Sequence, residues 1–179
     1  MAVLDIVKIG NPVLRCKCRS LKKAAMKSAK LQRFLNSMVE TMRAANGVGL
    51  AANQVGCSDR VIVLECKANK RYPDAEGFPL EMFFNPRILK YSRQTITDWE
   101  GCLSIPGYRG LVPRSKEVTF EAVTPEGKSV IKTVKGFHAR VIQHEVDHIN
   151  GTFYIDRMPD LLSWIHLDEF NSRFHTRIK

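Results

Sequence analysis

The sequence lacks the long apolar run that a membrane-spanning helix needs. No hydrophobic stretch approaches ~20 residues, although 44% of the 179 residues are hydrophobic. The N-terminal residues MAVLDIVK also lack the basic stretch and following apolar stretch of a secretory signal. We therefore expect a cytoplasmic protein with no membrane partner. The length fits a single domain over residues 1–179.

Acidic residues are scarce relative to basic ones. The chain carries 28 lysines and arginines against 18 aspartates and glutamates, which gives a formal net charge of +10. This excess favours an acidic partner such as ribosomal RNA. The sequence contains no recognised nucleic-acid-binding motif, so a solvated basic face is the simpler interpretation. A transient ribosome contact through this face stays a candidate interaction.

Cysteines are few and do not form a pattern. The chain has five of them, an odd number, and we expect it in a reducing compartment, so a disulfide framework is disfavoured. Cys16 and Cys18 are close together, but no second close pair completes a four-cysteine zinc site. Each cysteine is therefore expected to be a small buried hydrophobe unless another motif recruits it.

Hydrophobic periodicity predicts the main elements. Apolar residues at helical spacing predict a helix over 28–45, ended by Gly47. Gly136 begins a second predicted helix, and a third covers about 160–173. Alternating or continuous apolar runs predict strands at 61–65, 81–91, 117–123 and 129–134, the last two as a hairpin around Pro125. Residues 67–79 are expected to form a surface excursion.

The order of these elements indicates the fold class. Strands outnumber helices, and the chain shows no alternation of strands and helices that would indicate a parallel sheet. We therefore predict an α+β fold of mostly antiparallel sheets packed around a central helix, with an N-terminal helix and a short C-terminal helix.

The strongest chemical signal is Gln143-His-Glu-Val-Asp-His148, an H-E-x-x-H motif on the second predicted helix. His144 and His148 are four residues apart and lie on one helix face, where two imidazoles can bind one metal ion. Glu145 lies about 100° around the helix from His144. From there its carboxylate can take a proton from water and return it to a leaving group. We interpret Asp147 as a solvated surface carboxylate.

Two histidines leave a catalytic metal one protein ligand short. One protease pattern continues to a third histidine, but the corresponding residue here is Tyr154. A second protease pattern uses a downstream carboxylate, and Asp168 or Glu169 lies at a compatible distance. The third option is an upstream thiolate, for which Cys102 is well placed at a bending strand end. The residues alone leave the carboxylate and the thiolate open.

A glycine-containing segment, Gly47-Val-Gly-Leu-Ala-Ala-Asn-Gln54, is the second unusual feature. It superficially matches a dinucleotide-binding fingerprint, but that motif requires a preceding strand and a following helix. Here a helix precedes it, so we reject this interpretation. The two glycines allow backbone groups to face a ligand. Gln54 adds a side-chain amide that could stabilise an oxyanion.

Three segments together resemble the signature motifs of peptide deformylases, in order and at family-like separations: the segments 47–54, Glu100-Gly-Cys-Leu-Ser104 and 143–148. The resemblance extends from Ile9 to Arg157. It implies an enzyme that removes the formyl group from the N-terminal methionine of nascent formylated polypeptides. It also implies one divalent metal ion per chain, natively Fe²⁺, with Zn²⁺ or another divalent ion as a substitute.

The resemblance assigns roles to individual residues. Cys102, His144 and His148 would be the metal ligands, and Glu145 the general acid and base. The Gln54 amide and the Leu103 backbone N–H would stabilise the negative charge that develops on the formyl oxygen.

The substrate contacts come partly from the resemblance and partly from helix phase. By resemblance, backbone groups of Val48, Gly49 and Gly101 would pair with the peptide as an added strand. Phe137 and Val141 lie on the metal-facing side of their helix and should form an apolar wall for the methionine side chain. The resemblance also implies a structural ion pair between Glu100 and Arg114, and a place at the substrate rim for Arg109.

Two alternative functions compete with this hypothesis. The first is a zinc endopeptidase of the H-E-x-x-H type that uses Asp168 or Glu169 as its third ligand. The second is a basic RNA- or ribosome-binding protein whose metal site is structural.

Overall fold

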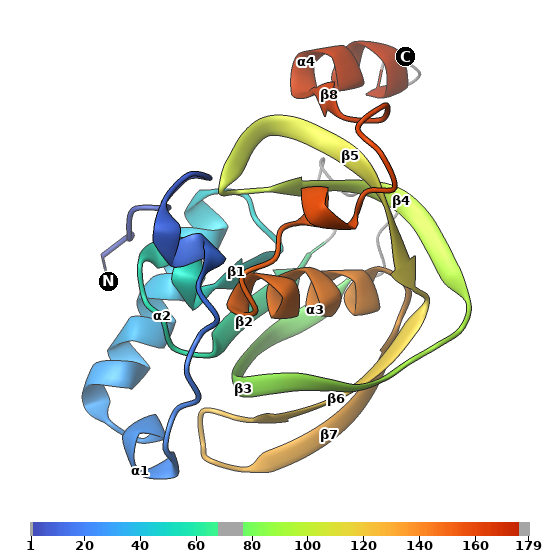
Figure 1. Ribbon diagram of the computed structural model, residues 1–179. Coiled ribbons are helices and arrows are strands. Elements are labelled where there is room, and N and C mark those ends of the chain that lie inside the picture. The colour runs from blue at the N-terminus through green and yellow to red at the C-terminus, as the bar shows by residue number, and fades with distance from the viewer. Residues whose placement is uncertain (1, 68–76, 176–179) are drawn as a thin grey trace.

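The computed structural model describes residues 2–67 and 77–175. Helix α3 (Gly136–Ile149) lies between a five-stranded antiparallel sheet and a three-stranded one (Figure 1). This arrangement confirms the predicted α+β class with a central helix that carries the H-E-x-x-H motif. Of the expected surface excursion at 67–79, residues 68–76 lie outside the described residues, and Phe78 and Pro79 already belong to a strand.

The five-stranded sheet has the order β1-β2-β3-β6-β7. Its strands are β1 (Gly49–Ala51), β2 (Val61–Cys66), β3 (Phe78–Tyr91), β6 (Glu117–Val123) and β7 (Ser129–Lys135). The predicted hairpin is confirmed, because β6 and β7 pair without a register shift from Glu117↔Lys135 to Val123↔Ser129. Strand β3 continues through Pro86 by means of an irregularity, with Asn85 at φ 51° and a register shift between Phe84 and Arg87.

The three-stranded sheet has the order β4-β5-β8 and was not apparent from periodicity. Its strands are β4 (Thr95–Cys102), β5 (Ile105–Ser115) and β8 (Ile165–His166). Cys102 pairs with Ile105, so β4 and β5 are joined by a turn of only two residues. The register shifts between Glu100 and Cys102, which makes Cys102 the end of a bent strand, as its flanking glycine suggested.

The predicted N-terminal helix is α2 (Ala29–Ala44), preceded by the single turn α1 (Lys23–Met26). The Ser28 hydroxyl begins α2 by accepting a hydrogen bond from the Leu31 backbone N–H at 3.3 Å. Apolar residues along one face of α2 pack on β1 and β2 and form an apolar cluster with them. Short 3₁₀ helices occur at Pro12–Arg15, Ala52–Val55 and Tyr154–Arg157.

The C-terminal helix begins later than predicted. Residues 160–166 are not helical, and helix α4 covers Leu167–Phe170, followed by the π-helical turn η4 (Asn171–His175). The cause is tertiary: Ile165 and His166 pair with Arg109 and Tyr108 of β5. No helix among the described residues is long and apolar enough to cross a membrane.

Helix α3 is buried on nearly every side, and its two faces differ in chemistry. Ala139, Ile142, Val146 and Ile149 join the apolar core beneath the five-stranded sheet. The opposite face carries His144 and His148 toward β4 and β5, whose Cys102 belongs to a separate apolar cluster with Phe153 and Tyr154. The helix thus holds its two histidines between the two sheets.

Candidate metal centre

Cys102, His144 and His148 converge from β4 and α3. The Cys102 Sγ lies 3.2 Å from Nε2 of His148, and that nitrogen lies 3.2 Å from Nε2 of His144. The three ligand atoms all lie within 4.8 Å of one another. A tetrahedral ion with bonds of about 2.0–2.3 Å spaces its ligands roughly 3.3–3.6 Å apart. A thiolate and two imidazoles at this spacing therefore fit one divalent metal ion.

The downstream carboxylates are not brought to this cluster. Asp168 and Glu169 lie on α4, with 87% and 61% of their side chains exposed, and they contact His166 and Arg173. Among the described residues, the group that could hold a metal ion consists of Cys102, His144 and His148. The structure thus favours the thiolate over the carboxylate as third ligand.

Glu100 orients the first histidine. Its Oε2 lies 2.9 Å from Nδ1 of His144. Burial opposes ionisation of Glu100, but the hydrogen bond from His144 and the charge of Arg114 hold its pKa well below its ordinary value. An ionised carboxylate accepts the Nδ1 proton and leaves the lone pair of Nε2 facing the cluster.

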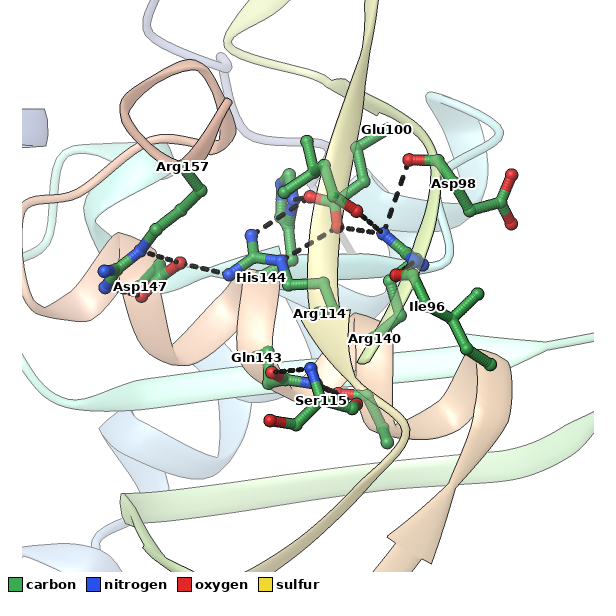
Figure 2. Close-up of polar contacts among 12 residues, drawn as sticks. Ile96, Asp98, Glu100, Arg114, Ser115, Arg140, Gln143, His144, Asp147 and Arg157 are labelled. Carbon is green, nitrogen blue, oxygen red and sulfur yellow. Dashed lines mark hydrogen bonds and ion pairs between the residues drawn. The ribbon is translucent and has the colours of Figure 1, made fainter. Parts of the chain in front are cut away.

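A network of buried charges surrounds Glu100 (Figure 2). Arg114 donates to both Glu100 oxygens, from Nε at 2.9 Å and Nη2 at 3.0 Å, which confirms the expected ion pair. Arg140 donates to Glu100 at 2.8 Å and to the carbonyl oxygens of Ile96 at 2.7 Å and Val112 at 2.9 Å. These hydrogen bonds connect helix α3 to strands β4 and β5.

Asp147 extends this network, and the expectation that it is solvated is wrong. Only 6% of the residue is exposed, and its carboxylate pairs with Arg114 and with Arg157, the latter at 2.8 Å (Figure 2). Sequence reasoning missed both Arg140 and Arg157. Arg140 is buried although charged residues on a helix normally face solvent, whereas half of the Arg157 side chain is exposed. The signal that could have found Arg140 is its spacing of four residues before His144, on the metal-facing side of α3.

Glu145 is buried beside the ligands and is held close to β1. A Cβ added at Gly49 would lie 2.3 Å from its Oε1, so only glycine leaves room for the carboxylate there. Its Oε2 has no hydrogen-bond partner among the described residues. Burial raises the pKa of Glu145 to about 7. A carboxylate with one unpaired oxygen next to a metal site can accept a proton from water.

Gln54 is held with its amide toward Cys102. Its Oε1 accepts a hydrogen bond from the Ala51 backbone N–H at 2.9 Å, which fixes the orientation of the side chain. Its Nε2 donates to Ser104 Oγ at 3.2 Å and to Cys102 Sγ at 3.5 Å. Leu103 follows Cys102 in the β4–β5 turn, and its carbonyl oxygen accepts a hydrogen bond from Lys8 Nζ at 3.1 Å.

A cleft opens beside these residues, and we call it the metal-site cleft. Its lining residues include the predicted set of Gln54, Cys102, Leu103, His144, Glu145, Val48, Gly49, Gly101, Phe137 and Val141. Trp99 and Arg140 also line it and were not predicted. Arg109 does not: only 7% of it is exposed, and its guanidinium carbon lies 4.8 Å from the centre of the Phe170 ring on α4.

Comparisons with known proteins agree with this geometry. The family model described as polypeptide deformylase matches residues 3–164. Peptide deformylase 1 of Nitrosomonas europaea is 43% identical over 166 residues, which cover 93% of each chain. Peptide deformylase 2 of Pseudomonas putida is 41% identical, over 88% of this chain and 89% of its own.

A solved structure extends the likeness to three dimensions. The Met-Ala-Ser-bound class I type b peptide deformylase of Acinetobacter baumannii superposes with a TM-score of 0.86 at 38% identity. The match covers 88% of this chain and 99% of that one. This chain therefore belongs to the polypeptide deformylase family, and it is an enzyme that hydrolyses the formyl group from peptides.

Proposed function

We propose that Cys102, His144 and His148 hold one divalent metal ion, at which the chain hydrolyses the formyl group of formyl-methionine on nascent polypeptides. The observation that carries this proposal is the convergence of the three ligand atoms within 4.8 Å at the wall of an apolar cleft. When bound, a divalent ion supplies Lewis acidity, which polarises the formyl oxygen and lowers the pKa of water.

The proposed native ion is Fe²⁺, and Zn²⁺ or another divalent ion can take its place. The support is the donor set, because one thiolate and two imidazoles suit both iron and zinc. Glu100 contributes by holding the His144 ring in the tautomer that ligation needs, through the 2.9 Å contact at Nδ1.

Glu145 is the proposed general acid and base. It takes a proton from the attacking water and passes it to the departing amine, so that the peptide leaves with a free N-terminus. Its position supports this role, because it lines the metal-site cleft with one oxygen unpaired among the described residues. The Gln54 amide and the Leu103 backbone N–H are the proposed donors to the negative formyl oxygen.

The substrate is proposed to bind as an added strand. Strand β1 is an edge of the five-stranded sheet as described, because β2 is its one strand neighbour there. Backbone groups of Val48 and Gly49 at this edge, and of Gly101 across the cleft, can pair with an extended peptide. Phe137 and Val141 then form the apolar wall for the methionine side chain.

The setting of the enzyme follows from its substrate. We propose that residues 1–179 form a single catalytic domain that acts in the cytoplasm. Nascent polypeptides are its partners, and the basic surface that accounts for the net charge of +10 supports a transient contact with the ribosome.

Formate release tests the proposal directly. Anaerobically prepared protein loaded with Fe²⁺ should release formate from formyl-Met-Ala-Ser and should leave acetyl-Met-Ala-Ser intact. Cleavage of an internal peptide bond, with no formate, would instead indicate an endopeptidase. If fully metallated protein catalysed neither reaction, this would contradict an enzymatic role for the candidate metal centre.

A further inference from the structure

Residues 7–9 near the N-terminus, which we call the N-terminal brace, contact two parts of the chain that border the metal cluster. The Val7 backbone N–H donates to the Gln54 carbonyl oxygen at 2.9 Å. The Ile9 backbone N–H donates to the Ser104 carbonyl oxygen at 2.8 Å. The brace therefore joins the 3₁₀ helix that carries Gln54 to the end of the β4–β5 turn.

Lys8 adds a side-chain contact to the same turn. Its Nζ donates to the Leu103 carbonyl oxygen at 3.1 Å. That oxygen belongs to the peptide group that joins Leu103 to Ser104, and the N–H of this group donates to Cys102 Sγ at 3.3 Å. A single peptide group thus has a cation at its oxygen and the sulfur of a proposed metal ligand at its hydrogen.

This arrangement has a chemical consequence for the sulfur. A cation at a carbonyl oxygen polarises the peptide group and strengthens its N–H as a hydrogen-bond donor. Hydrogen bonds to a ligating sulfur reduce the charge that the sulfur donates to the metal. The Gln54 amide also donates to Cys102 Sγ, at 3.5 Å, so the Ser104 N–H makes the shorter of these two contacts.

The surroundings of the two hydrogen bonds differ. Ser104 is fully buried and Cys102 is almost fully buried, and a hydrogen bond is stronger in such an interior than in water. Lys8 is exposed, so water and salt weaken the effect of its charge. We therefore expect the influence of Lys8 on the sulfur to be small in magnitude and to depend on salt.

We propose that Lys8 is a positioning residue for the hydrolysis: through the peptide group between Leu103 and Ser104 it strengthens the hydrogen bond to Cys102 Sγ and so preserves the Lewis acidity of the bound metal ion. This inference rests on the proposed function, in which Cys102 is a ligand. Because the effect reaches the reaction through the metal, loss of the charge should lower kcat and leave KM unchanged.

The first test is spectroscopic and needs no substrate. The protein is loaded with Co²⁺, whose bond to a thiolate gives a charge-transfer absorption band. Lys8→Met keeps the length of the side chain and the backbone bonds of Val7 and Ile9, but it removes the charge. The sulfur should become richer in electrons, so the band should move to longer wavelength. Lys8→Gln should show the same shift, and Lys8→Arg should restore the wild-type position.

The second test is kinetic. With formyl-Met-Ala-Ser, kcat of Lys8→Met should fall about two- to fivefold at low salt, the size expected for one exposed charge. The loss should shrink in about 1 M salt, where exposed charges are screened. Lys8→Arg should recover most of the wild-type kcat. A loss that appears in KM instead would mean that Lys8 acts on substrate binding, and it would overturn the inference.

The matched control is Lys17→Met, which makes the same change of charge elsewhere. Lys17 lines a cleft with Cys18 and Val146 that contains none of the three proposed ligands, so its band and its kcat should equal those of the wild type. An unmoved band in Lys8→Met, or an equal shift in Lys17→Met, would overturn the inference while leaving the function intact. Absence of the thiolate band from Co²⁺-loaded wild type would overturn the proposed ligand set, and the inference with it.

Discussion

Oε2 of Glu100 lies 2.9 Å from Nδ1 of His144, on the side of the imidazole that faces away from the other two ligands. The carboxylate is almost fully buried and is matched by two arginines, Arg114 and Arg140. Because a buried carboxylate at this position keeps its charge only with such partners, the arginines act on the metal centre through Glu100. The orientation of His144 therefore depends on residues of β4 and β5 as well as on its own helix α3.

Glu100→Gln should weaken metal binding. The amide keeps the size of the side chain but accepts the Nδ1 proton less strongly, and changes of this kind typically cost about 10–100-fold in affinity. Competition with a chromogenic chelator measures the effect. Glu121→Gln is the control, because Glu121 pairs with Arg87 at the surface, where 41% of its side chain is exposed. Equal affinities for the two variants would argue against an orienting role.

Glu145→Gln should separate metal binding from turnover. The variant should keep its metal, since Glu145 is not among the three ligands, and should lose about 10²–10⁴-fold in kcat because it cannot carry a proton. Metal analysis and formate release, performed on the same sample, check both statements. Wild-type turnover in this variant would remove Glu145 from the mechanism.

Gly49→Ala should impair catalysis by displacing Glu145. The added Cβ would lie 2.3 Å from Oε1, so the carboxylate has to move, and a displacement near 1 Å can cost about 100-fold in rate. A double-mutant cycle shows whether Gly49→Ala acts on catalysis through Glu145. In a Glu145→Gln background the same glycine substitution should cost little more, whereas fully additive losses would mean that Gly49 acts independently of Glu145.

Glu81 should make stability depend on pH at a distance from the metal centre. It contacts Lys132 and, at 2.9 Å, Nε2 of His138. Burial alone would raise its pKa, but the hydrogen bonds from His138 and Lys132 hold it below the ordinary value of 4.5. Since the folded-state pKa is the lower one, this stabilisation is present above pH 4.5 and is lost as the pH falls through the folded-state value.

Glu81→Gln should therefore lower the free energy of unfolding by about 1–3 kcal/mol at pH 7. The difference from the wild type should shrink as the pH falls below 4.5. Urea unfolding across this range measures it, with Glu117→Gln as the control for a more exposed pair with Lys135. A difference that stays constant into acid would show that the charge of Glu81 is not what stabilises the fold.

Local sequence patterns predicted the helices and strands in which apolar residues recur at the spacing typical of that element. Helices α2 and α3, strand β2 and the β6–β7 hairpin follow from spacing alone, because each buries one face or lies wholly in the core. Strand β5 does not, since Pro106, Gly107 and Gly110 interrupt the alternation that marks a strand. The C-terminal segment was predicted only in part, because Trp164 and β8 are held by contacts with β5.

The candidate metal centre likewise contains residues that local patterns predicted and residues that they did not. Helical spacing placed His144, Glu145 and His148 together, whereas Cys102 comes from a strand far away in the sequence, and only the family resemblance favoured it over a carboxylate. Helical spacing could have placed Arg140 near His144, but the burial of Asp147 could not be predicted, because its charge is tolerated in the interior only by arginines on other elements. Such partners become visible only when the chain is folded.

The metal content of a Cys102 variant tests the central claim most directly. Cys102→Ala, Cys66→Ala and Glu169→Ala are purified anaerobically, and the ratio of metal to protein is measured for each. Cys66 is a buried cysteine outside the cluster, and Glu169 is the rival ligand. Cys102→Ala should lose its metal while the other two bind it in a ratio of about one to one, as one tetrahedral site requires. An equimolar metal ion in Cys102→Ala, or its loss from Glu169→Ala, would contradict the account.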